Sequence, residues 1–180
     1  MLIILTLWST IQNNANAEIS SINTRIQTNK LNNFGLIDGD STVIKANDVN
    51  NIGTARIYGG HLAIQANKLN NLENADGTAA TIAARERLDL GVGNLINRNH
   101  SLILSLGNLY IGGKLDENNQ ATGYANSIDN GSATIEALES GWINTHHLLN
   151  QDLHLKLGKK VEKEQINEYS LGSDSHRYRG

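Results

Sequence analysis

Three histidines near the C-terminal end, His146, His147 and His154, are of a residue type that commonly binds transition metals. Adjacent residues of a β-strand point to opposite faces, so His146 and His147 cannot both ligate one ion without a bend in the backbone. We therefore interpret the three as surface side chains. We expect no metal site and no cofactor.

Two carboxylates and one cation, Asp38, Asp40 and Arg56, suggest hydrolytic chemistry on a polysaccharide. Glycoside hydrolysis needs two carboxyl groups at a set separation on either side of the scissile bond. The spacing of these residues does not require such a pair, because solvated charges at outward positions have the same pattern. We expect no catalytic residue and no enzymatic activity, with a β-helical carbohydrate-active enzyme as an alternative.

A row of asparagines recurs along the chain and suggests a set of ligand-binding amides. Asparagine also tolerates the left-handed backbone of tight turns, and stacked asparagines hydrogen-bond to one another along a ladder. These properties predict a structural role at corners of the fold. The members of the row are Asn33, Asn51, Asn71, Asn97 and Asn130.

These residues are positioned by a repeat that is clearest between residues 37 and 71. The segment IKANDVNN at 44–51 returns twenty residues later as IQANKLNN at 64–71. A fixed period of this length is typical of proteins whose units bury apolar side chains by stacking on their neighbours. Within a repeat the apolar residues are two apart, as in Leu62, Ile64 and Ala66, which predicts a strand. No two-residue hairpin turn separates the matched segments, which predicts parallel stacking.

The repeat predicts an all-β fold, a parallel β-helix or solenoid of about six coils between residues 19 and 150. Polar loop excursions are expected at 72–80 and 112–120, and residues 53–55 are expected to loop outward. One inward row is predicted to contain Ile44, Ile64, Leu90 and Ile111.

The two ends of the chain differ from this periodic region. Residues 1–18 are interpreted as a signal-like segment or as the remnant of a preceding coil. An apolar run at 1–8 precedes Ala15-Asn16-Ala17, which has the form of a signal-peptidase site, but no Lys or Arg precedes that run. Residues 151–180 are expected to be a polar segment that ends the repeats. Charged residues at 159–164 are expected to cover the last coil.

The composition favours an aliphatic core and argues against several classes of protein. Of the 180 residues 39% are hydrophobic, 4% are aromatic and none is proline, which suits strands whose N–H groups are all needed for pairing. The net charge of −3, without a run of Lys or Arg, argues against binding to nucleic acid or an anionic membrane. The absence of cysteine excludes disulfides and thiolate metal sites.

Four phrases of the sequence together resemble a known family. They are IQANKLNN at 64–71, LYIGG at 109–113, ATGYAN at 121–126 and SATIEA at 132–137. They are similar to the haemagglutinin repeats of filamentous-haemagglutinin-like exoproteins, which include adhesins and the stalks of contact-dependent growth-inhibition toxins. The resemblance covers residues 19–180 and implies a right-handed parallel β-helix, with the haemagglutinin repeats at 19–150.

The resemblance also implies a function, a structural and adhesive rod segment of a secreted bacterial exoprotein on the outer face of the cell surface. It implies export by an outer-membrane transporter of the two-partner secretion route. The implied binding partner is a receptor or glycan on a host or neighbouring cell. Family members are usually far longer than 180 residues, so we expect a fragment or a broken reading frame. An inert fragment of a toxin stalk is an alternative.

Overall fold

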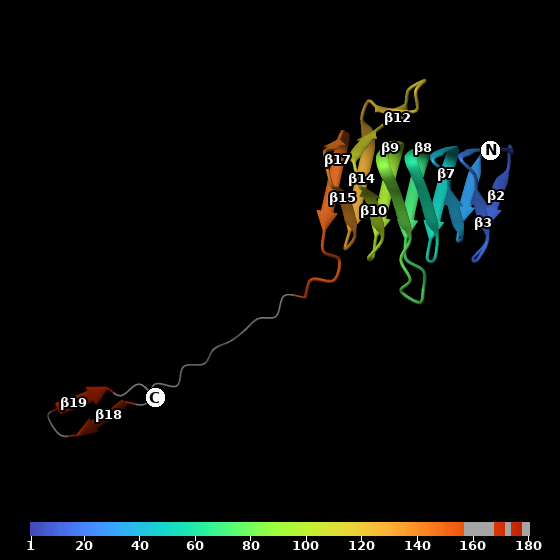
Figure 1. The fold of residues 1–180 in the computed structure, drawn as a ribbon. Coiled ribbons are helices and arrows are strands. Elements are labelled where there is room, and N and C mark those ends of the chain that lie inside the picture. The colour runs from blue at the N-terminus through green and yellow to red at the C-terminus, as the bar shows by residue number, and fades with distance from the viewer. Residues whose placement is uncertain (157–167, 172–173, 178–180) are drawn as a thin grey trace.

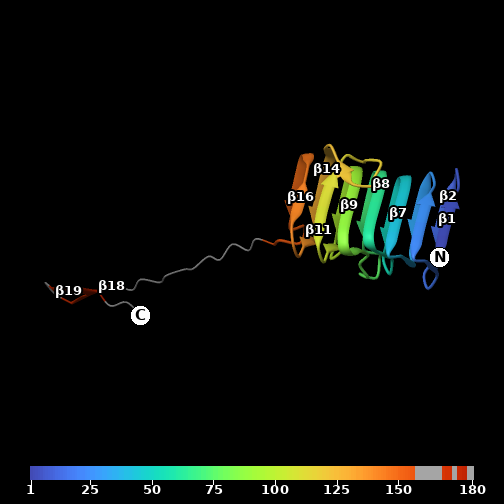
Figure 2. The ribbon, with the colours of Figure 1, turned by 45° about the horizontal axis from the view of Figure 1, so that its top comes forward.

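The computed structural model describes residues 1–156 in full and the backbone of residues 168–171 and 174–177. Within these ranges there is no helix, and a parallel sheet of 15 strands makes up most of the fold. No helix that is long and apolar enough to cross a membrane occurs among the same residues. The strands of the sheet lie side by side in a regular stack (Figure 1, Figure 2). The predicted all-β class and the parallel pairing are confirmed.

The strands of the sheet form three rows, in which each strand pairs in parallel with its counterpart one repeat earlier or later. The first row contains the predicted inward positions, and successive members are register partners and buried: Ile44, Ile64, Leu90 and Ile111. That prediction is confirmed. The row consists of β1 (Leu2–Thr6), β4 (Asn23–Gln27), the start of β7 (Ser41–Ile52), the middles of β8 (Arg56–Leu72) and β9 (Thr81–Arg98), β11 (Asn108–Gly112) and β16 (Gly141–Ile143).

The second and third rows follow the same rule of one strand per repeat. The second row consists of β2 (Thr10–Asn13), β5 (Lys30–Asn33), the ends of β7, β8 and β9, β14 (Ala125–Gly131) and β17 (Thr145–Gln151). The third row consists of β3 (Glu18–Ser20), β6 (Leu36–Asp38), the starts of β8 and β9, β10 (Leu102–Ser105) and β15 (Thr134–Ala137).

The alternation of apolar and polar residues explains why these segments form strands with one buried face. In β4, Thr24 and Ile26 are buried, whereas Arg25 and Gln27 between and after them are exposed. A strand places successive side chains on opposite faces, so this pattern buries one face and leaves the other in water. The core is aliphatic as predicted, and each fully buried Ile or Leu contributes about 1.5–3 kcal/mol.

A ladder of asparagines, here called the inner ladder, runs through the second row. Each side-chain amide donates a hydrogen bond of 2.8 Å to the amide oxygen of the next asparagine, although the sequence interval between them varies from 18 to 33 residues. The prediction of hydrogen-bonded corner asparagines is confirmed, but the predicted set was incomplete at both ends. The inner ladder contains Asn13, Asn33, Asn51, Asn71, Asn97, Asn130 and Asn150.

The N-terminal residues belong to the sheet. β1 pairs with β4 and β2 pairs with β5, both in parallel, which is the arrangement that the preceding-coil interpretation of residues 1–18 predicts. The expectation that residues 53–55 loop outward is wrong for two of the three. Only Thr54 is exposed. Gly53 adopts a φ of 66°, which makes a tight turn, and Ala55 is therefore buried in the core.

Two longer insertions leave the stack where polar excursions were predicted. Residues 73–80 form a loop between β8 and β9. Residues 113–124 carry a short antiparallel pair, β12 (Lys114–Leu115) and β13 (Ala121–Thr122), here called the hairpin arm. A separate antiparallel pair, β18 (Glu168–Leu171) and β19 (Asp174–Arg177), lies in the C-terminal segment. The predicted charged cover at 159–164 lies outside the described residues.

Candidate functional site

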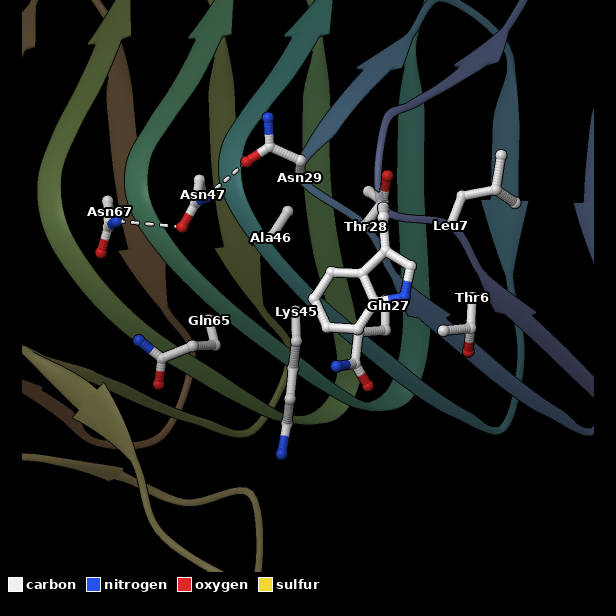
Figure 3. Close-up of a pocket in the computed structure, with 11 residues that line it drawn as sticks. Thr6, Leu7, Gln27, Thr28, Asn29, Lys45, Ala46, Asn47, Gln65 and Asn67 are labelled. Atoms are coloured by element: carbon white, nitrogen blue, oxygen red, sulfur yellow. Dashed lines mark hydrogen bonds between the residues drawn. The ribbon is translucent and has the colours of Figure 1, made fainter.

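A groove of about 330 Å³ runs over the outward face of the first row, near the N-terminal side of the stack (Figure 3). Its floor is built from outward side chains of β4, β7 and β8, and the connection between β1 and β2 forms one wall. The lining residues are Thr6, Leu7, Trp8, Gln27, Thr28, Asn29, Lys45, Ala46, Asn47, Gln65 and Asn67.

Two lines of polar side chains cross the groove along the axis of the stack. Gln27, Lys45 and Gln65 are register partners on neighbouring strands, so they project from the same face. A second line, here called the outer ladder, is formed by Asn29, Asn47 and Asn67. In this ladder Asn67 Nδ2 donates to Asn47 Oδ1 at 3.1 Å, and Asn47 Nδ2 donates to Asn29 Oδ1 (Figure 3).

The wall of the groove carries an aromatic side chain in open solvent. Trp8 lies between β1 and β2 and is 91% exposed, beside the exposed Leu7. An indole offers a large apolar face and one N–H donor. The groove therefore combines an apolar platform with hydroxyl, amide and ammonium groups, which is the mixture found in sites that orient a small polar ligand.

A second hollow of about 150 Å³ continues from the first, since both are lined by Thr6, Gln27 and Lys45. It adds Arg25 from β4 and Asn119 from the hairpin arm. Beyond Gln65, which lines the groove, its register partner Gly91 lies beneath the hairpin arm. A Cβ at Gly91 would lie 2.4 Å from the backbone carbon of Lys114, so glycine is needed where the hairpin arm crosses the sheet.

The hairpin arm is held by a buried carboxylate, Asp89, on the outward face of β9. Arg87 donates two hydrogen bonds to Asp89, from Nε at 2.6 Å and from Nη2 at 3.0 Å. His61 Nε2 lies 2.9 Å from Asp89 Oδ2, and the Ala121 N–H of β13 donates to Oδ1 at 2.8 Å. The Asp89 side chain is fully buried under the arm, so it fixes the arm and offers no surface to a substrate.

Burial raises the pKa of Asp89, but the hydrogen bonds from His61, Arg87 and the Ala121 N–H outweigh this effect and hold the pKa below its usual value. The Arg87 guanidinium lies 4.0 Å from the centre of the Tyr110 ring, and Tyr110 stacks on Trp142 with ring centroids 4.5 Å apart. These contacts link Arg87 of β9 to β11 and β16. The cluster is best explained as an anchor for the arm.

Asp38 and Arg56, two of the residues considered for hydrolysis and not expected to be catalytic, have different partners in the structure. Asp38 Oδ1 accepts hydrogen bonds from the Gly39 N–H and from Arg85 Nη2, at 2.7 and 3.0 Å. Arg56 Nη1 donates instead to the carbonyls of Thr54 and Ala55, at 2.9 and 3.0 Å. Asp38 is thus paired with a cation that sequence reasoning did not consider, and Arg56 does not bridge the carboxylates of Asp38 and Asp40.

Of the three histidines considered as metal ligands, His147 is exposed on β17, where its register partner is Ser127. His146 stacks on Tyr124, with ring centroids 5.5 Å apart. His154 Nδ1 lies 3.0 Å from Ser132 Oγ, and its ring stacks on His100 at 5.9 Å. Within the described part of the chain, no group of three or more His, Cys, Asp or Glu side chains is arranged to hold a metal ion.

The buried members of the inner ladder, from Asn13 to Asn130, use their amide hydrogens within the fold. The Asn71 amide, for example, donates to Asn97 Oδ1 at 2.8 Å and to the Leu102 carbonyl at 3.0 Å, and Asn71 is fully buried. The exposed outer ladder is the better candidate for binding.

No family model, curated protein or solved structure matches this chain. The candidate site therefore depends on its geometry and chemistry alone. Sequence reasoning missed the groove, because Trp8 lies in a segment that was interpreted only as signal-like or as the remnant of a preceding coil. One signal was present in the composition: Trp8 is one of only two tryptophans in the chain. For Asp89, which lies between Leu88 and Leu90, no local signal distinguishes a carboxylate covered by a distant arm from a solvated one.

Proposed function

We propose that this chain is a rod segment, a right-handed parallel β-helix of about six coils, with a structural and adhesive role in a secreted bacterial exoprotein. The observation that carries this proposal is the register of the stack. Three rows of strands keep parallel pairing from β1 to β17, with one register shift in β8 between Gly59 and His61, and the inner ladder keeps one hydrogen-bond length throughout.

Such a stack suits a rod that holds binding surfaces away from a cell. Each repeat contacts only its neighbours, so length is added without enlarging the core, and outward side chains and loops remain available for contact. The resemblance to haemagglutinin repeats supports an adhesin at the bacterial cell surface. It also supports export by an outer-membrane transporter of the two-partner route, and a receptor or glycan on another cell as partner.

The shape and the adhesion can be tested on the purified chain. Small-angle X-ray scattering should give an elongated particle, and a crystal structure should show a right-handed coil. Beads coated with the chain should adhere to cells more strongly than beads coated with an Ile64→Asp variant, in which a charge in the core disrupts the stack. Equal adhesion of the two bead types, or adhesion by neither, would rule out an adhesive role of the folded segment.

A further inference from the structure

We propose that the groove beside Trp8 binds a linear acidic polysaccharide, a chain of uronate sugars, and that this glycan is the surface ligand of the rod. The proposal rests on the adhesive function proposed above and names the chemical class of its partner. It is carried by the charge, spacing and exposure of the groove residues.

The charge of the groove is opposite in sign to that of the whole chain. The residues that line the groove and its continuation include two cations, Arg25 and Lys45, and no Asp or Glu. The chain as a whole has a net charge of −3. Among the described residues no carboxylate forms an ion pair with Lys45 or Arg25. Both cations are exposed, so they are available to an anionic ligand.

The spacing of the groove residues suits a ligand that repeats along the axis. Parallel strands lie about 4.8 Å apart, so Gln27, Lys45 and Gln65 present polar groups at that interval. A pyranose unit of an extended polysaccharide has a similar length, so successive sugars can face successive strands. The ammonium of Lys45 has three donors for a carboxylate, and the Gln27 amide has both donors and an acceptor for hydroxyls.

The wall and the far end of the groove define how a sugar chain lies in it. The exposed indole of Trp8 provides a flat apolar surface on which the C–H face of a sugar ring can pack. At the far end, Gln65 Oε1 accepts the Leu115 N–H of the hairpin arm at 2.5 Å. The arm therefore fixes the Gln65 side chain on this side of the groove.

Nucleic acid is a poorer match for this groove. Affinity for nucleic acid comes mainly from neutralising one phosphate per nucleotide, which requires a patch of many Lys and Arg residues. The groove has two cations and a larger number of amides and hydroxyls. This composition fits a polymer that has fewer charges per unit length than nucleic acid and many hydroxyl groups. A uronate chain has one carboxylate per acidic sugar and hydroxyls on every ring.

The proposal can be tested by calorimetric titration of the full chain with hyaluronate and alginate oligosaccharides. The control ligands are the same oligosaccharides with their carboxyl groups reduced to alcohols. We expect binding of at least one acidic oligosaccharide, weaker binding of its reduced form, and a loss of affinity as salt is raised. Equal binding of acidic and reduced forms would overturn the assignment of an acidic ligand.

Two variants test whether binding occurs in this groove. Lys45→Gln and Trp8→Ala should each weaken binding about tenfold, since a charge-assisted hydrogen bond or a buried aromatic contact is worth about 1.4 kcal/mol or more. The matched controls are Lys68→Gln and Tyr124→Ala, which change an exposed lysine and an exposed aromatic outside the groove. Melting temperatures of Lys45→Gln, Trp8→Ala and Lys68→Gln should equal that of the parent, and that of Tyr124→Ala, which loses its stacking on His146, should be no more than slightly lower.

The binding and adhesion results together distinguish failure of the proposed ligand from failure of the proposed adhesive function. Equal losses in the groove variants and their controls would overturn the groove as the site. If the beads adhere to cells but the chain binds no uronate oligosaccharide, the assignment of the ligand is refuted. The proposed adhesive function is then retained. Uronate binding that depends on Lys45 and Trp8, without adhesion to cells, would support the groove and refute the proposed function.

Discussion

The inner and outer ladders use the same side chain at similar intervals and in opposite environments. Asn51 and Asn71 of the inner ladder are fully buried, and each also donates to a backbone carbonyl, of Thr81 and Leu102 respectively. Asn47 and Asn67 of the outer ladder are exposed and bond to each other at 3.1 Å. The repeat alone does not separate the two ladders, because both recur in register.

The difference shows that burial decides what a recurring amide does. A buried amide without partners is costly, so the inner asparagines are held by several hydrogen bonds and stabilise the corners. An exposed amide exchanges its hydrogen bonds with water at little cost, so the outer asparagines and Gln27 remain available to a ligand.

The largest effect should come from placing a charge on the inner side of the stack. Ile64→Asp buries an unpaired carboxylate among Ile44 and Leu90 and should lower the free energy of unfolding by about 4 kcal/mol or more. The control Asn67→Asp, on the outer side, should change it by less than ~0.5 kcal/mol. Urea unfolding followed by circular dichroism measures both. Equal unfolding midpoints would mean that Ile64 is not in a core.

Asp89 sharpens the comparison, because it faces outward but is buried by the hairpin arm. Asp89→Asn leaves Arg87 and His61 without their anion and should lower the free energy of unfolding at pH 7 by about 2–3 kcal/mol. The lowered pKa of Asp89 means that its contribution is complete above about pH 4 and is lost as the pH falls through the folded-state pKa.

The parent and Asp89→Asn should therefore differ most at neutral pH and converge in acid. Urea unfolding of both proteins at pH 7, 5 and 3 gives this difference directly. A difference that stays constant from pH 7 to pH 3 would mean that the Asp89 carboxylate does not stabilise the folded state.

A smaller effect is expected when one member of the inner ladder is removed. Asn71→Ala deprives Asn51 Nδ2, Asn97 Oδ1 and the Leu102 carbonyl of a partner, and should lower the free energy of unfolding by about 2 kcal/mol. Thermal unfolding measures the change. A melting temperature equal to that of the parent would show that water replaces the amide without loss.

The smallest effect is expected in the outer ladder. Asn67→Ala removes one hydrogen bond in solvent and should change the free energy of unfolding by less than ~0.5 kcal/mol. A loss comparable to that of Asn71→Ala, in the same thermal measurement, would remove the distinction between the two ladders.

The periodic part of the fold was predictable because the repeat itself specifies the register. Shifting a strand by one residue would exchange its two faces, so the match of 44–51 to 64–71 was enough to place Ile44 opposite Ile64. The same reasoning placed Asn97 opposite Asn130 across a long insertion. Ala55 was misplaced because a turn of one exposed residue and a longer loop look alike in sequence.

The groove and the Asp89 anchor were less accessible, since each depends on a segment that occurs once. Residues 113–124 have no second copy to compare with, so their path over Gly91 and Asp89 could not be derived from the period. Trp8 likewise lies in a connection between strands. The repeat predicts the recurring polar positions on the floor of the groove, but it does not predict the wall at Trp8 or the path of the hairpin arm.

The hydrogen bonds of the inner ladder are 2.8 Å long whether 18, 20, 26 or 33 residues separate the two asparagines. This constancy indicates where the chain tolerates insertions. The additional residues of the longer repeats form loops at the ends of strands. An insertion in such a loop therefore leaves the pairing and the core packing of the strands unchanged. Closing a flexible loop of twice the length costs only about 0.6 kcal/mol more. Evolution, or an engineer grafting foreign peptides, can therefore lengthen residues 73–80 or 113–124 while the scaffold beneath stays the same.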